Sequence, residues 1–204
     1  SIICYIGHGS STSWGSSGFN VNDIHNLTNK GPYPVIWSVA CVNGKFVHVN
    51  ECFGEAWLRK AKGGAVAIEC ASTNESWVPP CDKQAATVNA IIQKTHFTFG
   101  ALEAVGCVKA LQVWGDSDRT EGNKMAEQCN LFGDCTLLVR TKKPGRTTVT
   151  VNRGLDNNVV FNVTDGTYTQ PNATVTVYTS DFSYSTTGVT DASGNANISL
   201  EGSQ

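Results

Sequence analysis

Hydrophobic positions in the first two thirds of the chain follow two alternating patterns. Continuous apolar runs, bounded by glycine, proline and polar residues, are typical of strands buried on both faces of a parallel sheet. Other stretches carry an apolar stripe at helical spacing, as in residues 50–64, where Phe53, Ala56, Trp57 and Ala61 share one face. The pattern predicts an α/β domain. Its expected strands are 1–7, 34–40, 64–72 and 136–140, and its further helices are 84–95 and 99–114.

The pattern changes after residue 143. Thr, Val, Asn, Gly and Ser dominate, and apolar residues alternate strictly with polar ones in 173–178 and 195–200. Such alternation, broken by turn sequences, predicts the strands of an all-β module. Its length of 61 residues is short for a seven-stranded sandwich of about 100. We therefore expect domains at 1–143 and 144–204, the second an incomplete β-sandwich.

Composition excludes several classes of function. The 204-residue chain is 40% apolar and 16% charged, which is enough to form a packed core, and its net charge is −2. No basic run suits nucleic-acid binding, and no apolar run approaches the roughly 20 residues of a membrane span. The first residues form a buried strand with no preceding turn, so we expect the chain to begin inside a domain.

Cysteines and glycosylation sequons indicate an oxidising, secretory setting. Eight cysteines are present, and without any C-x-x-C pair a structural zinc site is only weakly supported, so no metal site is expected. If Cys41 stays free, seven remain, and Cys4 is the candidate for a free thiol or a bond to chain not present here. A secreted or cell-surface glycoprotein is expected, with acceptor sites at Asn26, Asn74, Asn162, Asn172 and Asn197.

Two reactive side chains follow neighbouring predicted strands. His8 comes after the strand at 1–7, and Cys41 comes after the strand at 34–40. Function in open parallel sheets collects at the carboxyl ends of the strands. A cysteine and a histidine there suggest a thiolate nucleophile with a general base. The backbone N–H groups of Gly9 and Cys41 are candidates for the oxyanion hole.

Longer stretches carry a family resemblance over about residues 3–143. The segments "GHGSSTSW", "SVACVNGKF", "ECFGEAWLRKAKGGAVAIECASTNESW", "TFGALEAVG" and "LFGDCTLLVRT" resemble the gingipain family of secreted cysteine endopeptidases, more closely its lysine-specific branch. The resemblance implies a caspase-like α/β fold followed by an Ig-like β-sandwich. It also implies protein or peptide substrates and no required cofactor, and it allows a structural calcium ion.

The resemblance also implies roles for individual residues. It makes His8 the general base, Cys41 the nucleophile, and Gly9 with Cys41 the oxyanion hole. Trp77 matches an aromatic residue that covers the P1 side chain of the substrate. Asn74 and Glu75 are the positions available for the acidic selectivity residue of the lysine-specific branch.

The sequence departs from the family pattern in several places. The third, acidic catalytic residue and the first strands of the family's domain lie upstream of His8, so a preceding segment or a companion chain is expected to supply them. The loop before Trp77 is one residue shorter, and Ile6 replaces a small hydroxyl residue that touches the substrate. The P1 preference, including a basic one, is therefore left open. The extra cysteines suit two local disulfides, Cys129–Cys135 and Cys70–Cys81.

Two other clusters have simpler interpretations. Asp23 and His25 fit a helix start with a solvated histidine, and Asp116, Asp118 and Glu121 fit a solvated acidic turn because the EF-hand pattern is not met. Two functions follow. The first is a secreted cysteine endopeptidase. The alternative is a catalytically silent, glycosylated structural or adhesive protein, because a fold does not guarantee its usual activity.

Overall fold

The computed structural model describes residues 1–47, 50–142, 145–154 and 157–201. The chain divides into two compact units, Ser1–Thr141 and Lys142–Gln204. The expected boundary at 143/144 falls on residues outside the described ranges. Each unit is described by itself below.

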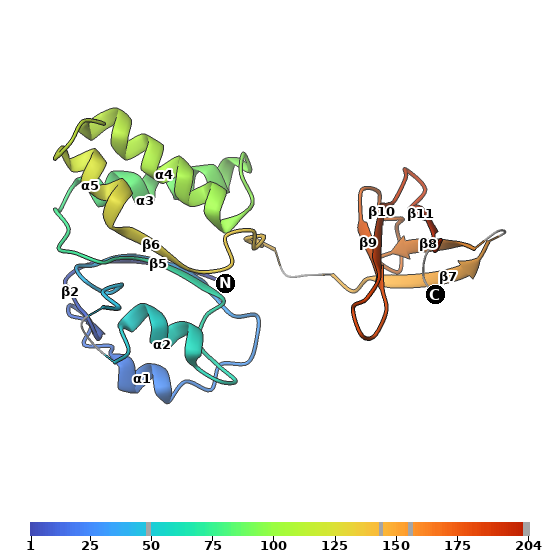
Figure 1. Cartoon of the computed structure of the whole chain (residues 1–204), viewed down its shortest axis with the longest axis horizontal. Coiled ribbons are helices and arrows are strands. Elements are labelled where there is room, and N and C mark those ends of the chain that lie inside the picture. Colours follow the sequence, from blue (N-terminus) through green and yellow to red (C-terminus); the bar gives the residue numbers. More distant parts are fainter. Residues whose placement is uncertain (48–49, 143–144, 155–156, 202–204) are drawn as a thin grey trace. The chain divides into compact units, whose positions relative to one another are not determined.

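A four-stranded mixed sheet forms the centre of the first unit (Figure 1). Strands β1 (Ile2–Ile6), β4 (Val35–Val39) and β5 (Ala67–Ala71) are parallel, as their continuous apolar runs predicted. Strand β6 (Cys129–Gly133) pairs with β5 in the antiparallel sense, giving the order β1-β4-β5-β6. After β1, the short strands β2 (Gly9–Ser10) and β3 (Ser13–Trp14) form a hairpin.

Helices cover both faces of this sheet (Figure 1). Helices α1 (Val21–His25) and α2 (Phe53–Arg59) lie on one face. Helices α3 (Pro79–Gln93), α4 (Phe99–Trp114) and α5 (Glu121–Gln128) lie on the other. The α/β sandwich predicted from the alternating patterns is confirmed.

Coverage of both faces of the sheet explains why β4 and β5 are almost entirely apolar. Side chains alternate between the faces of a strand, and here both faces are covered. Ile36 and Ile68 join the core beneath α1 and α2, whereas Trp37 and Ala67 join the core beneath α4. All residues of both strands are buried.

Two sequence-based assignments at the end of this unit are wrong. The expected strand at 136–140 contributes only an isolated bridge between Thr98 and Leu138. The last strand is β6, which lies in a stretch interpreted as a disulfide loop. The acidic stretch before it begins as a turn, but Glu121 starts α5, with the Thr120 side chain as N-cap. This helix was missed because it buries few residues, Met125 among them, so its apolar stripe is short.

The second unit is all-β. Strands β11 (Asn195–Ser199), β8 (Asn158–Thr164) and β7 (Thr148–Arg153) form one antiparallel sheet. Strands β9 (Thr174–Tyr178) and β10 (Ser185–Val189) form a second. The alternating stretches therefore form strands as predicted. The assignment of this module as Ig-like stays a prediction.

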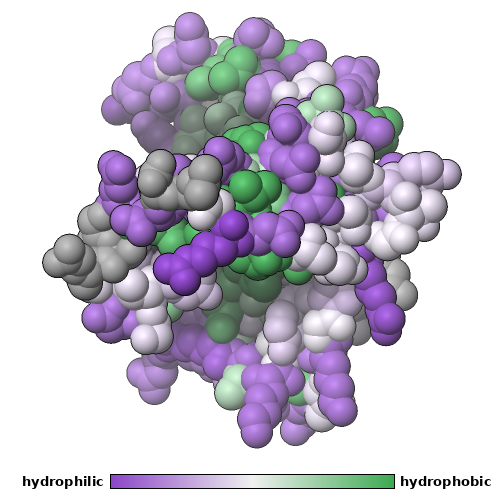
Figure 2. Space-filling view, turned by 90° about the vertical axis from the view of Figure 1, so that its right-hand side faces the viewer, coloured by the Kyte–Doolittle hydropathy of each residue, from purple (hydrophilic) through white to green (hydrophobic). Residues whose placement is uncertain are grey.

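The surface is predominantly hydrophilic in the view of Figure 2, with hydrophobic residues showing in patches between polar ones. None of the helices among the described residues is both long and apolar enough to cross a membrane.

Candidate active site

Three parallel strands deliver the candidate site residues to one edge of the sheet. His8 lies two residues beyond β1, Cys41 two beyond β4, and Glu75 four beyond β5. These residues, together with six neighbours, line one small cavity. The neighbours are Ile6, Gly7, Val39, Ala40, Ser76 and Trp77. His8 and Cys41 therefore line the same cavity.

The backbone of His8 is held by neighbouring hydroxyl groups. The Tyr5 hydroxyl donates to the His8 carbonyl at 2.9 Å, and the His8 N–H donates to Ser16 Oγ at 3.0 Å. The Gly15 N–H donates to the same His8 carbonyl at 2.7 Å. Sequence reasoning missed Tyr5 and Ser16, because nothing in the spacing of these hydroxyls marks them. The imidazole is exposed and lines the cavity, so it can exchange a proton with a group bound there.

Cys41 occupies a tight turn against two other segments. The Glu75 N–H donates to Cys41 Sγ at 3.3 Å, so the thiol is oriented by the segment that follows β5. Gly9 lies against the Cys41 turn: a Cβ at Gly9 would stand 2.7 Å from the Cys41 carbonyl oxygen. Glycine at this position therefore allows the two strand ends to approach each other closely.

Trp77 forms one wall of the cavity. Its ring packs edge-on against His8, with 5.0 Å between ring centroids and 82° between planes. The side chain is 64% exposed, and Ile6 beside it is 53% exposed. A large, solvent-facing indole at a cavity mouth suits the covering of an incoming side chain.

Glu75 lines this cavity and carries a carboxyl group that is largely buried. Its Oε2 atom is buried and has no hydrogen-bond partner. Burial raises the pKa of Glu75 to about 8, with the negative charge of Glu69 adding to the effect and Lys83 opposing it. A buried carboxyl oxygen without a partner is costly, so a cationic ligand group would stabilise the ionised form of Glu75.

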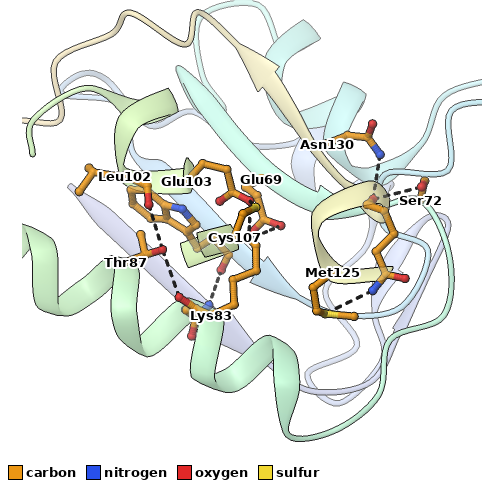
Figure 3. A network of polar contacts seen from close by, with 12 residues as sticks. Glu69, Ser72, Lys83, Thr87, Leu102, Glu103, Cys107, Met125 and Asn130 are labelled. Carbon is orange, nitrogen blue, oxygen red and sulfur yellow. Dashed lines mark hydrogen bonds and ion pairs between the residues drawn. The ribbon is translucent and has the colours of Figure 1, made fainter. Parts of the chain in front are cut away.

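A buried ion-pair cluster of Glu69, Lys83 and Glu103 (Figure 3) acts electrostatically on Glu75. Lys83 Nζ lies 3.2 Å from Glu69 Oε1 and 2.5 Å from Glu103 Oε1, and all three side chains are at least nine-tenths buried. Burial opposes the charge of Lys83, but the two carboxylates outweigh it and raise the pKa of Lys83 above its usual range. Burial also raises the pKa of Glu69. The sequence feature that could have revealed this cluster is Glu69, a single acidic residue inside an apolar run.

Among the described residues, the group whose side chains lie close enough together to bind one metal ion overlaps this cluster. Glu69, Glu103 and Cys129 offer ligand atoms within 4.8 Å of one another. The Lys83 ammonium already contacts both carboxylates, which leaves little reason for a cation to bind there. Asp116, Asp118 and Glu121 belong to no such group within the described ranges.

Both expected disulfides are contradicted, because all four thiols are free. A Cβ added at Gly54 in α2 would stand 2.7 Å from Cys70 Sγ, so Cys70 faces α2. Cys81 lies in α3 on the opposite face of the sheet, where its thiol donates to the Trp77 carbonyl at 3.1 Å. The sheet itself separates this pair.

The other pair is separated by extended backbone. Cys129 begins β6 and Cys135 follows its end. Five extended residues span roughly 13 Å between the first and last Cα atoms, whereas a disulfide needs Cα atoms within about 7 Å. Cys135 instead packs against Gly100 at the start of α4.

One residue expected in the site, Asn74, does not line the cavity. Asn74 is exposed and lines a separate depression with residues of α5. Among the sequons, Asn26, Asn172 and Asn197 are also exposed. Asn162 is half-buried, and its Nδ2 donates to Asn195 Oδ1 at 2.9 Å.

Comparisons with known proteins agree with this geometry. The model of peptidase family C25 matches residues 1–140. The chain belongs to this family. It is 37% identical to gingipain R1 of Porphyromonas gingivalis over 159 residues, which are 74% of this chain and 16% of that protein. Lys-gingipain from the same species is 36% identical over only 73 residues, so the expected greater similarity to the lysine-specific branch is not supported.

Solved structures extend the similarity to both units. The crystal structure of the Arg-specific cysteine proteinase gingipain R matches with a TM-score of 0.80 and 30% identity, covering 98% of this chain and 46% of that one. A complex of pro- and mature domains of a P. gingivalis gingipain gives 0.80 and 31%, covering 98% and 48%. The caspase-like fold of the first unit is thereby confirmed. The chain spans about half the length of these structures.

Proposed function

We propose that the protein is a cysteine endopeptidase in which Cys41 is the nucleophile and His8 the general base. The observation that carries this proposal is the meeting of a half-buried thiol and an imidazole in one cavity at the ends of adjacent parallel strands. Membership of family C25 supports it. The comparisons do not favour the alternative of a catalytically silent structural protein.

The reaction follows from these groups. His8 accepts the thiol proton, and Cys41 Sγ bonds to the carbonyl carbon of the scissile peptide. The resulting oxyanion is held by the N–H groups of Gly9 and Cys41. The imidazolium returns its proton to the leaving amine, which breaks the C–N bond. Water then hydrolyses the thioester, releasing the acid and restoring the thiol.

A basic P1 residue is the substrate feature that the cavity favours. Glu75 supplies an unpaired carboxyl oxygen, and a P1 guanidinium or ammonium group would provide its partner. Trp77 would cover the aliphatic part of that side chain. The choice between arginine and lysine depends on the depth of the cavity, to which Ile6 contributes.

We also propose a partner for the uncovered face of β1. Ile3 and Tyr5 pack into the core beneath α1 and α2. On the other face, Ile2 is 37% and Ile6 53% exposed, and Cys4 is exposed. A further part of the catalytic domain, from a preceding segment or a companion chain, would cover this face and supply the third, acidic catalytic residue. We also propose that the protein is secreted, because most of its glycosylation sequons are exposed.

Covalent labelling of the whole natural protein tests the catalytic proposal. Peptidyl acyloxymethyl ketones with Arg, Lys or norleucine at P1 would be applied under mild reduction, and the adduct located by peptide mass mapping. We expect selective labelling of Cys41 by a basic probe, abolished by heat unfolding and by His8→Ala. Labelling of the exposed Cys4 and Cys135 at the same rate as Cys41 would contradict an assembled active site.

A further inference from the structure

Asn43 is a buried amide directly behind the nucleophile. It lies two residues after Cys41, in the same turn, and is completely buried. An amide buried in this way needs partners for its oxygen and for both of its N–H groups. The Ser38 hydroxyl of β4 donates to Asn43 Oδ1 at 2.8 Å.

The N–H groups of Asn43 reach the hairpin that follows His8. Nδ2 lies 2.6 Å from the Ser10 carbonyl oxygen and 3.0 Å from the Ser13 carbonyl oxygen, and donates to both. These carbonyls belong to β2 and β3. One side chain therefore ties the Cys41 turn to both strands of the hairpin.

A second hydrogen bond closes the connection. Trp14 Nε1, in β3, donates to Ser38 Oγ at 2.8 Å, and Ser38 is itself buried. The resulting chain of bonds runs from Trp14 through Ser38 to Asn43 and back to the hairpin. Its polar atoms are satisfied, and a satisfied buried network specifies one arrangement of the segments that it joins.

Backbone pairing alone does not provide this connection. The ladder between β1 and β4 ends with the bond from the Gly7 N–H to the Val39 carbonyl, before either His8 or Cys41 is reached. Beyond this bond, the two segments are connected by the contact of Gly9 with the Cys41 turn, by the Trp14–Ser38 hydrogen bond and by the Asn43 amide.

We propose that Asn43 is a positioning residue that sets the placement of the His8 imidazole relative to the Cys41 thiol. The proposal rests on the proposed cysteine-protease function. Asn43 touches no reacting atom; it acts through the two segments that carry the base and the nucleophile. Because misplacement of reacting groups by about 1 Å can reduce a rate by about 100-fold, its loss should reduce kcat more than it changes KM.

Alkylation of Cys41 by iodoacetamide tests this role without requiring peptidase turnover. The rate would be measured from pH 5 to pH 9 on the whole protein, with His8→Ala defining the profile of the thiol without its base. We expect Asn43→Ala and Asn43→Asp to shift the profile toward that of His8→Ala. The aspartate keeps the acceptor for Ser38 but has no N–H for Ser10 and Ser13. We also expect kcat to fall about 10- to 100-fold.

The matched control is Asn29→Ala. Asn29 makes two hydrogen bonds with the backbone of Gly64, at 2.9 Å each, away from the cavity. This variant should lower the melting temperature but leave the alkylation profile unchanged. If Asn43→Ala fails to fold, Ser38→Ala should produce a smaller shift in the same direction. It removes the donor to Asn43 Oδ1 and the acceptor of Trp14 Nε1 but leaves the bonds from Asn43 to Ser10 and Ser13.

The outcomes separate this proposal from the catalytic one. A folded Asn43 variant with an unchanged profile and kcat, or an equal shift in Asn29→Ala, would overturn the positioning role. If wild type and His8→Ala share one profile and wild type has no peptidase activity, the protease proposal itself fails.

Discussion

Gly9 shows how one missing side chain shapes the site. A Cβ there would stand 2.7 Å from the Cys41 carbonyl oxygen and 2.8 Å from the Ala40 Cβ. Both neighbours belong to the turn that presents the thiol, so they have little freedom to move aside. The close approach of the two strand ends therefore depends on glycine at this position.

We predict that Gly9→Ala separates His8 from Cys41. Overpacking of this kind costs about 1–3 kcal/mol of stability, and kcat/KM should fall by at least about tenfold because the catalytic groups move apart. Thermal unfolding and peptidase assays would measure both effects. Gly145→Ala is the control, since no heavy atom lies within 4 Å of the added Cβ. Equal activity in the two variants would contradict the prediction.

Glu75 should set the preference for a basic P1 residue. Glu75→Gln removes the charge while preserving size, so the ratio of kcat/KM for basic over neutral P1 substrates should fall about 10- to 100-fold, the value of a charge-assisted hydrogen bond. Glu127→Gln, at an exposed position of α5, is the matched charge control. An unchanged ratio in Glu75→Gln would assign selectivity elsewhere.

At the scale of elements, the segment that connects β5 to α3 contains Glu75 and Trp77, the cavity residues proposed to contact the substrate side chain. The Thr73 hydroxyl donates to Gln128 Oε1 of α5 at 2.6 Å, and the Ser76 hydroxyl donates to Glu121 Oε2 at 2.8 Å. Lys83 attaches the start of α3 to β5 and α4 through its two ion pairs. Three helices thus hold the segment that presents Glu75 and Trp77.

Loss of the Lys83 charge should destabilise this arrangement strongly. Lys83→Met leaves two buried carboxyl groups without their cation, and we expect a loss of about 3–5 kcal/mol in the free energy of unfolding. Combining it with Glu69→Gln and Glu103→Gln should recover part of this loss. Chemical denaturation measures both.

Lys124→Met provides the comparison for a surface pair. Lys124 Nζ lies 2.7 Å from Glu121 Oε1 within α5, and its side chain is half exposed. Such helix pairs contribute about 0.5 kcal/mol or less. Similar losses in both lysine variants would show that the buried cluster adds no special stability.

At the scale of the whole molecule, buried carboxyl groups make stability depend on pH. Burial raises the pKa of Glu75 from 4.5 to about 8 and also raises that of Glu69. The folded state therefore binds more protons than the unfolded state between these values. The contribution of these protonated groups to the free energy of unfolding is complete below about pH 4.5 and is lost as pH rises through about 8.

We therefore expect the free energy of unfolding to fall between pH 5 and pH 8.5. Each unit of pKa shift corresponds to about 1.4 kcal/mol, and Glu75→Gln should reduce the fall by roughly 1–3 kcal/mol. Denaturation at several pH values would measure the slope. A steeper fall in the variant than in wild type would contradict the assignment.

Much of the fold followed from local patterns. The runs that became β4 and β5 are almost entirely apolar because both faces of the sheet are covered there. The expectation that the run at 1–7 is also buried on both faces is wrong, because one face of β1 is exposed. Helix α5 and strand β6 were missed because they are short and half-polar, and their structure depends on packing against α4 and β5. The disulfide predictions failed for a related reason: sequence distance does not reveal which face of a sheet a cysteine occupies.

The sequence alone determined the chemistry available to this protein: a thiol and an imidazole after two apolar strands, and a glycine directly after the imidazole. Only the tertiary structure decided which side chains assist them. Glu75 rather than Asn74 enters the cavity, and Asn43 links the two strand ends. Local patterns report burial and periodicity, whereas these contacts join segments about 30 residues apart, whose meeting depends on the packed sheet.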